Sequence, residues 1–137
     1  MIEQTPLPFF RNNGGFEASG IKDTNNCTVI GFAIVTGVDY HTADLIAVKT
    51  KRKRRQGHWP AKMVAYAKRV YGMRFKKFKF SSMTIQKFIK TYPIGRYYVS
   101  TNKHCFAIID GVVNDHSNMN KRFGIIKDAW QFVYKAI

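Results

Sequence analysis

An apolar segment near the N-terminus, from Cys27 to Gly37, constrains the fold of this 137-residue chain more than any other feature. Its sequence, CTVIGFAIVTG, is apolar on nearly every side when wound as a helix. A segment of this length without polar alternation fits a buried helix better than a strand, although its Val and Ile content leaves a strand open. Asn25 or Asn26 would cap such a helix, and Gly37 would end it. The sequence therefore predicts a buried helix that begins at a cysteine.

Three further helices are predicted before the middle of the chain gives way to a different pattern. The first would take Asp39 as its N-cap, and the second would cover residues 61–71 and end at a glycine. The third would be capped by Ser82, cover residues 84–91 and end before Pro93. Between the second and third helices, a short strand or extended stretch is predicted from phenylalanines interleaved with lysines, at Phe75, Phe78 and Phe80.

The last third of the chain consists of short β-branched or aromatic runs separated by turns. Asp110-Gly111, between two of these runs, is a strong hairpin signal, and residues 130–134 would close the chain as a helix or a strand. Helices followed by a small antiparallel sheet predict an α+β fold. The length fits one domain, residues 1–137, with an irregular N-terminal arm over residues 1–24 and a highly basic helical segment over residues 45–90.

Several classes of protein are disfavoured by the same sequence. No apolar run reaches about 18 residues, so no membrane helix is expected. The first residues carry no basic stretch followed by an apolar one, so no signal peptide is expected. Two cysteines are too few for a disulfide scaffold or an all-cysteine zinc site, which predicts reduced thiols in a cytoplasm and no cofactor. The four histidines leave a mixed Cys/His zinc site open.

The net charge of +15 arises entirely within residues 45–90, which carry no acidic residue. Such a segment predicts an anionic partner: nucleic acid, a ribosome or an acidic protein surface. A solvated face is the alternative, and the interleaved aromatic residues fit a core better than a set of base-stacking platforms. The chain contains no recognisable nucleic-acid-binding motif. The candidate anion-binding residues are Lys49, Lys51, Arg52, Lys53, Arg54, Arg55, Lys68, Arg69, Arg74, Lys76, Lys77 and Lys79.

A pattern that suits nucleophilic catalysis lies outside this basic segment. Cys27 opens the buried helix, His104 opens a strand, and Asp115 follows the Asp110-Gly111 turn. An antiparallel hairpin would bring the region of Asp115 back beside His104. A helix N-terminus and a nearby imidazolium both stabilise a thiolate, and a carboxylate can hold the imidazole in one orientation.

Each of these residues also has a structural interpretation. A cysteine on an apolar helix or strand is more often inert core, which is the interpretation for Cys105 and for Cys27 taken alone. His104 can be a strand-edge residue and Asp115 a turn residue. Two other histidines compete for the role of base, although neither opens an apolar strand: His58 and His116.

The order of these blocks resembles that of small papain-like cysteine peptidases, in versions associated with bacteriophages and bacteria. Residues 25–33 and 37–43 resemble the cysteine-helix block of that family, and residues 84–99 resemble its unit of a helix, Pro-x-Gly and a strand. Residues 104–115 resemble its unit of a histidine, a strand, Asp-Gly, a second strand and an aspartate. The resemblance covers roughly residues 25–130 and implies a papain-like domain.

The resemblance assigns roles to individual residues. It implies that Cys27 is the nucleophile, His104 the general base and Asp115 the residue that orients it, acting on a peptide, isopeptide or other amide in a bacterial cytoplasm. The glutamine that papain-like enzymes place before the cysteine is missing, so Asn25 and Asn26 are the oxyanion candidates. A non-catalytic protein on the same fold, either a pseudoenzyme or a binding protein that uses residues 45–90, is the alternative.

Overall fold

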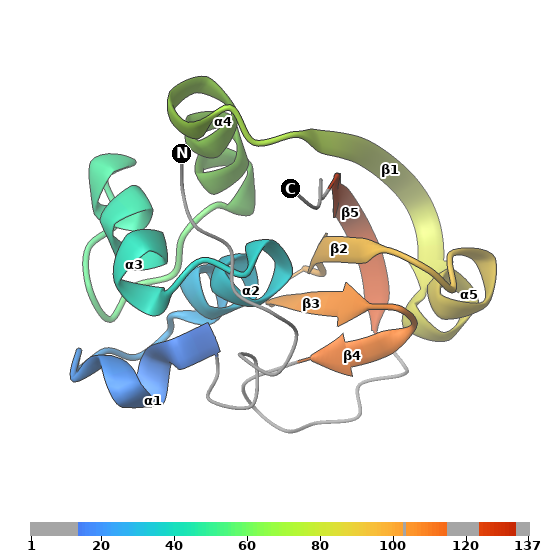
Figure 1. The fold of residues 1–137 in the computed structure, drawn as a ribbon. Helices are drawn as coiled ribbons and strands as arrows, with labels where there is room; N and C mark the ends of the chain where they lie inside the picture. Colours follow the sequence, from blue (N-terminus) through green and yellow to red (C-terminus); the bar gives the residue numbers. More distant parts are fainter. Residues whose placement is uncertain (1–13, 103, 115–123, 134–137) are drawn as a thin grey trace.

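The computed structural model describes residues 14–102, 104–114 and 124–133, and Figure 1 shows their arrangement. Within these residues the fold is α+β, as the sequence predicted, with one antiparallel sheet of five strands in the order β1-β5-β2-β3-β4. The elements are α1 (Phe16–Ser19), α2 (Cys27–Thr36), α3 (Tyr40–Lys49), α4 (Pro60–Tyr71), β1 (Phe75–Thr84), α5 (Ile85–Thr91), β2 (Arg96–Ser100), β3 (Cys105–Ile109), β4 (Val112–Asn114) and β5 (Ile125–Phe132).

Helix α2 is the buried helix expected from the apolar segment, and it begins at Cys27. Because the segment is helical, the strand alternative is wrong. Every residue after Cys27 in this helix is buried. Gly37 ends the helix in the left-handed conformation, with φ 80°, and its N–H donates to the carbonyl of Ala33. At Gly31, a Cβ would lie 3.1 Å from Cε1 of Tyr98, so the glycine lets α2 pack closely against the sheet.

The other predicted helices form, with one difference at the start of α5. The carboxylate of Asp39 accepts a bond from the N–H of Thr42 at 2.7 Å and caps α3, as expected. The cap of α5 is Thr84, which accepts from the N–H of Lys87 at 3.1 Å, and the predicted cap at Ser82 is wrong. Residue 82 lies instead in β1, because this strand pairs with β5 as far as Thr84. The segment 45–90 is therefore only partly helical.

Two apolar cores lie on opposite faces of the sheet, because successive strand residues point to alternate sides. One core contains α2, α3 and α4, and the sheet residues packed in it include Tyr98, Cys105, Ala107, Trp130 and Phe132. The other contains α5, and the sheet residues packed in it include Tyr97, Val99, Phe106, Ile108 and Ile126. Phe78 and Phe80 pack against this second core, which agrees with the structural role expected for those rings.

The hairpin predicted at Asp110-Gly111 connects β3 and β4. Both turn residues have positive φ values, 48° and 78°, which is the conformation that two-residue hairpin turns favour. The sequence left a helix or a strand open for residues 130–134. Residues 130–132 belong to strand β5. Residues 16–19 of the predicted irregular arm form α1, and residues 1–13 lie outside the described part. Among the described helices, none has the length and apolar character needed to span a bilayer.

Candidate functional site

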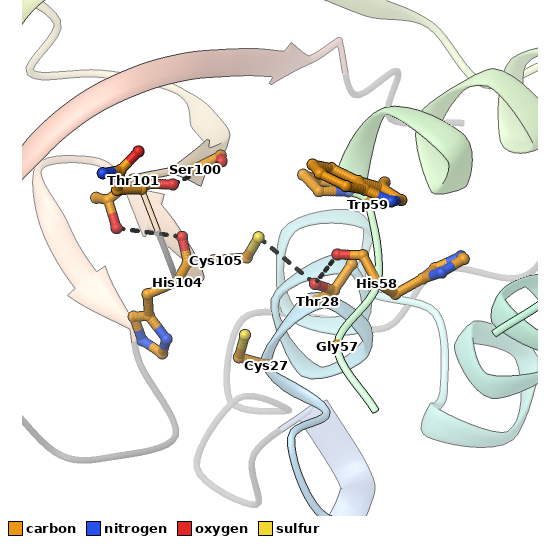
Figure 2. Close-up of a pocket in the computed structure, with 11 residues that line it drawn as sticks. Cys27, Thr28, Gly57, His58, Trp59, Ser100, Thr101, His104 and Cys105 are labelled. Carbon is orange, nitrogen blue, oxygen red and sulfur yellow. Dashed lines mark hydrogen bonds between the residues drawn. The ribbon is translucent and has the colours of Figure 1, made fainter. Parts of the chain in front are cut away.

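A pocket of about 310 Å³ opens where the start of α2 meets the start of β3 (Figure 2). Its third side is the loop before α4 together with the first residue of that helix, residues 57–60. Cys27 and Thr28 come from the helix, and His104 and Cys105 come from the strand and the residue before it. The pocket therefore joins residues that are 77 positions apart in the sequence (28 and 105).

Two hydrogen bonds and one ring stack hold the start of α2 and the start of β3 in place around the pocket. The hydroxyl of Tyr98, on the buried face of β2, donates to the carbonyl of Thr28 at 2.5 Å and holds the first turn of α2 on the sheet. The carbonyl of His104 accepts from the N–H of Thr101 at 2.9 Å, which closes the turn between β2 and β3. The His104 ring stacks on Phe106, with 5.7 Å between ring centroids and 29° between planes. These contacts place the histidine at the rim beside the helix start.

The Cys27 sulfur interacts with two neighbouring side chains. Hydrogen bonds from the Cys105 thiol and, after it, from the His104 ring lower the pKa of the Cys27 thiol well below its usual range. The backbone N–H of Cys105 and the charge of His104 act in the same direction, while partial burial opposes them. In Figure 2 the His104 ring and the Cys27 sulfur face the same gap. A thiolate at neutral pH beside an imidazole is the arrangement that thiol nucleophiles use.

Cys105 is the residue whose involvement the sequence did not predict. It is buried, 6% exposed, in agreement with its expected place in the core. Its side chain also lines the pocket, and its sulfur lies 3.5 Å from Oγ1 of Thr28. The hydrogen bond to Cys27, followed by burial, raises the pKa of Cys105 well above its ordinary value. The only sequence signal was its position directly after His104, because no spacing rule connects Cys105 to Cys27.

His58 lines the pocket with its backbone and does not compete with His104. Its carbonyl accepts from the Thr28 hydroxyl at 2.9 Å, while its ring points away from Cys27 in Figure 2. Its Nε2 lies 2.7 Å from Oγ1 of Thr50. Burial, and then the charges of Lys62 and Arg52, lower the pKa of the His58 ring. The bond to Thr28 attaches the loop before α4 to the first turn of α2.

The third member of the predicted triad, Asp115, lies outside the described residues, as does His116. Strand β4 is described as far as Asn114, which pairs with Ala107. The sequence-based role of Asp115 therefore stays a prediction.

Neither oxyanion candidate lines the pocket. The side-chain amide of Asn26 donates to the Tyr40 hydroxyl at 2.9 Å inside the core, and Asn26 is 4% exposed. The side-chain amide of Asn25 donates to the carbonyl of Arg55 at 3.0 Å. The start of α2 offers other donors, because the first N–H groups of a helix have no intrahelical partner. These groups of Cys27 and Thr28 are the donors that suit an oxyanion.

Arg52 does not belong to an anion-binding surface, and that prediction is wrong. Its side chain is 1% exposed and forms an ion pair with the buried carboxylate of Asp23, 2.6 Å between Nη1 and Oδ2. The guanidinium also donates to the carbonyls of Thr24 and Gln56, at 3.1 and 2.9 Å. The sequence places Arg52 in a run of cations. In the structure, Arg52 attaches the α3–α4 loop to the segment that leads into Cys27.

Other candidate cations also have acidic or aromatic neighbours. Arg54 pairs with Asp44 at 2.7 Å, and Lys77 lies 3.8 Å from Asp128. Arg69 lies over the ring of Tyr66, 5.5 Å from its centroid. Acidic residues outside the basic segment therefore compensate part of its charge. The other exposed candidates are Lys49, Lys51, Lys53, Arg55, Lys68, Arg74, Lys76 and Lys79.

Within the described residues, no group of three or more His, Cys, Asp or Glu side chains is arranged to hold a metal ion. Comparison of the chain with protein-family models, with curated proteins and with solved structures gave no match.

Proposed function

We propose that this protein is a papain-like thiol hydrolase that cleaves an amide bond of a peptide or isopeptide, with Cys27 as nucleophile and His104 as general base. The observation that carries the proposal is the position of Cys27 on the first residue of α2, beside the His104 ring and open to a pocket. The low pKa of the Cys27 thiol supports it, because the thiolate is the reactive form.

In the proposed reaction, the Cys27 thiolate attacks the carbonyl carbon of the substrate amide. The backbone N–H groups at the start of α2 stabilise the resulting oxyanion. The His104 imidazolium protonates the leaving nitrogen, the C–N bond breaks, and a thioester remains on Cys27. His104 then takes a proton from water, which attacks the thioester and releases a carboxylic acid and free Cys27. Asp115 would orient the ring of His104.

The pocket itself suits a polypeptide substrate that lies across the helix start. Trp59, at the rim, is 70% exposed, the largest exposed fraction of any aromatic residue in the part that the structure describes. An exposed indole beside a nucleophile offers an apolar platform for a substrate side chain. On the resemblance alone, we assign the protein to the cytoplasm of a bacterium infected by a phage.

The test is hydrolysis of a fluorogenic peptide library by the purified chain and by three variants. Cys27→Ala and His104→Gln should each lower the rate by about 10³-fold or more, because the two residues act as one unit. Lys53→Ala, an exposed change away from the pocket, is the matched control and should keep the rate. Turnover that survives Cys27→Ala would contradict the proposal.

A second candidate function, binding of a polyanion without catalysis, is favoured by a specific observation. The α3–α4 loop carries three exposed cations for which no ion pair is found among the described residues: Lys51, Lys53 and Arg55. Binding to RNA or DNA through such residues weakens steeply with salt, because each phosphate contact releases a counterion. Negligible binding at low salt, with no dependence on salt concentration, would contradict this second function.

A further inference from the structure

The chain contains only two cysteines, and the structure brings both to the same pocket. Cys27 is half-buried on the first turn of α2, and Cys105 is buried on the first residue of β3. Cys27 directly precedes Thr28, whose Oγ1 lies 3.5 Å from the Cys105 sulfur, and Figure 2 shows the sulfurs of Cys27 and Cys105 on the same side of Thr28. Two thiols at one pocket are a different observation from a single reactive cysteine, because one can react with the oxidised form of the other.

We propose that Cys27 and Cys105 form a reversible disulfide when a hydroperoxide oxidises Cys27. The inference rests on the reactive thiolate of the proposed function and adds regulation of the same site. Oxidation would stop hydrolysis, because the nucleophilic sulfur would be bonded to Cys105. Reduction by a cellular dithiol would restore the thiolate.

The chemistry proceeds in two balanced steps. The Cys27 thiolate attacks one oxygen of the hydroperoxide, the O–O bond breaks, and an alcohol or water leaves as Cys27 becomes a sulfenic acid. The Cys105 sulfur then attacks the Cys27 sulfur, and hydroxide leaves with the Cys105 proton as water. The two thiols together lose two electrons, and the peroxide gains them.

The arrangement also explains how a buried thiol can become the attacking group. In the reduced protein the Cys27 thiolate at the same pocket is the first cause of the high pKa of Cys105. A sulfenic acid carries no such charge, so oxidation of Cys27 removes that cause. The Thr28 hydroxyl, 3.5 Å from the Cys105 sulfur, keeps that sulfur at the pocket. The sulfurs then close to bonding distance, about 2.05 Å.

Placement of the second thiol inside the core has a chemical consequence. A sulfenic acid without a nearby thiol goes on to the sulfinic and sulfonic acids, which a dithiol does not reverse. A buried Cys105 meets little free peroxide, so Cys27 is oxidised first and Cys105 remains available to trap it. The disulfide therefore protects Cys27 from permanent loss.

The test treats the purified full chain with hydrogen peroxide and follows its intact mass after denaturation and alkylation. The wild type should lose about 2 Da and take up no alkyl group, and dithiothreitol should restore both thiols. Because the chain has two cysteines, a monomer with this mass can contain only the Cys27–Cys105 bond.

Two variants make the result decisive. Cys105→Ser keeps a small polar side chain and should gain about 16 Da, then about 32 Da that dithiothreitol does not remove. Cys27→Ser should show neither the loss nor the gain. A wild type that gains oxygen without forming the disulfide, or that forms only disulfide-linked dimers, would overturn the inference.

The outcome is separable from the fate of the proposed function. Labelling of Cys27 by iodoacetamide in untreated protein, together with peptide hydrolysis but no disulfide, would overturn this inference and leave the hydrolase in place. Disulfide formation in a chain that hydrolyses no peptide would support this inference and contradict the hydrolase.

Discussion

The two walls of the pocket come from regions of different net charge. The wall made by the starts of α2 and β3 belongs to the part of the chain without net charge, and it carries Cys27 and His104. The wall made by residues 57–60 belongs to the basic segment, residues 45–90. From the sequence alone, the pattern that suits catalysis lies outside this segment, for which we expected an anionic partner. The structure shows that this segment also completes the pocket.

The comparison also divides the cations of the basic segment into two kinds. Arg52 is buried, holds the segment before Cys27 through Asp23 and Thr24, and donates to the Gln56 carbonyl within its own loop. Lys53, its neighbour, is exposed. Net charge is therefore a poor guide to function at single positions, because burial decides whether a cation supports the fold or meets a partner.

The largest effect on stability is expected at the buried cation. Arg52→Ala should lower the free energy of unfolding by about 3–5 kcal/mol, because it leaves the Asp23 carboxylate buried without its partner. Lys53→Ala, one position away and exposed, should stay within about 0.5 kcal/mol of the wild type. Urea unfolding of both variants measures the difference. Similar values for the two would contradict the division into two kinds of cation.

The same ion pair should make stability depend on pH. Burial alone would raise the pKa of Asp23, but the bonds from Arg52 and from the backbone N–H of Arg55 outweigh it and lower the pKa. The folded protein therefore holds the carboxylate charged at a pH where the unfolded chain begins to protonate it, near its ordinary pKa of about 3.9. This contribution is complete above that pH and is lost as the pH falls through the folded value. Thermal melts between neutral and acid pH should show the loss, and Arg52→Ala should reduce it.

On the catalytic wall, a smaller effect is expected for His104→Gln. The bonds from Cys105 and His104 lower the pKa of the Cys27 thiol, so loss of the imidazole should raise that pKa. Below its pKa of about 4, the Cys27 thiolate fraction falls about tenfold for each unit that the pKa rises, so we expect that decrease in the alkylation rate at acid pH and similar rates well above both pKa values. Stopped-flow alkylation across pH would show the inflection of the wild type well below about 8.5 and that of the variant at higher pH.

The smallest effect is expected at the exposed cations. Lys53→Ala and Arg55→Ala together should leave the alkylation rate unchanged and lower the affinity for a polyanion. If both residues contact phosphates, the slope of log affinity against log salt should fall by about 0.9 for each. Titration with a single-stranded oligonucleotide at several salt concentrations measures this. An unchanged slope would contradict a role for Lys53 and Arg55 in binding a polyanion.

Local signals were sufficient for much of the fold. The apolar run of α2 with Gly37 at its end, the Asp39 cap of α3 and the Asp110-Gly111 turn were all predicted, because each depends on neighbours within a few residues. The cap at Ser82 was wrong because pairing of β1 with β5, which joins Thr84 to Ile125, extended the strand past it. That pairing connects segments about forty residues apart, beyond any local rule.

The candidate site was predictable only in part for the same reason. Cys27 and His104 could be selected from the sequence because each opens an apolar element. The packing of α2 against the sheet brings the two residues to one pocket. Nothing local linked Arg52 to Asp23 or Cys105 to Cys27, because these contacts depend on how distant elements pack.

One measurement tests the central claim most directly: mass-spectrometric mapping of limited iodoacetamide labelling of the native chain at a series of pH values from acid to neutral. The account predicts that Cys27 is alkylated well ahead of Cys105, and that His104→Gln moves the inflection of Cys27 labelling to higher pH. Equal labelling of both cysteines, or an inflection for Cys27 that does not move in His104→Gln, would contradict the claim that the structure builds a reactive thiol at the start of α2.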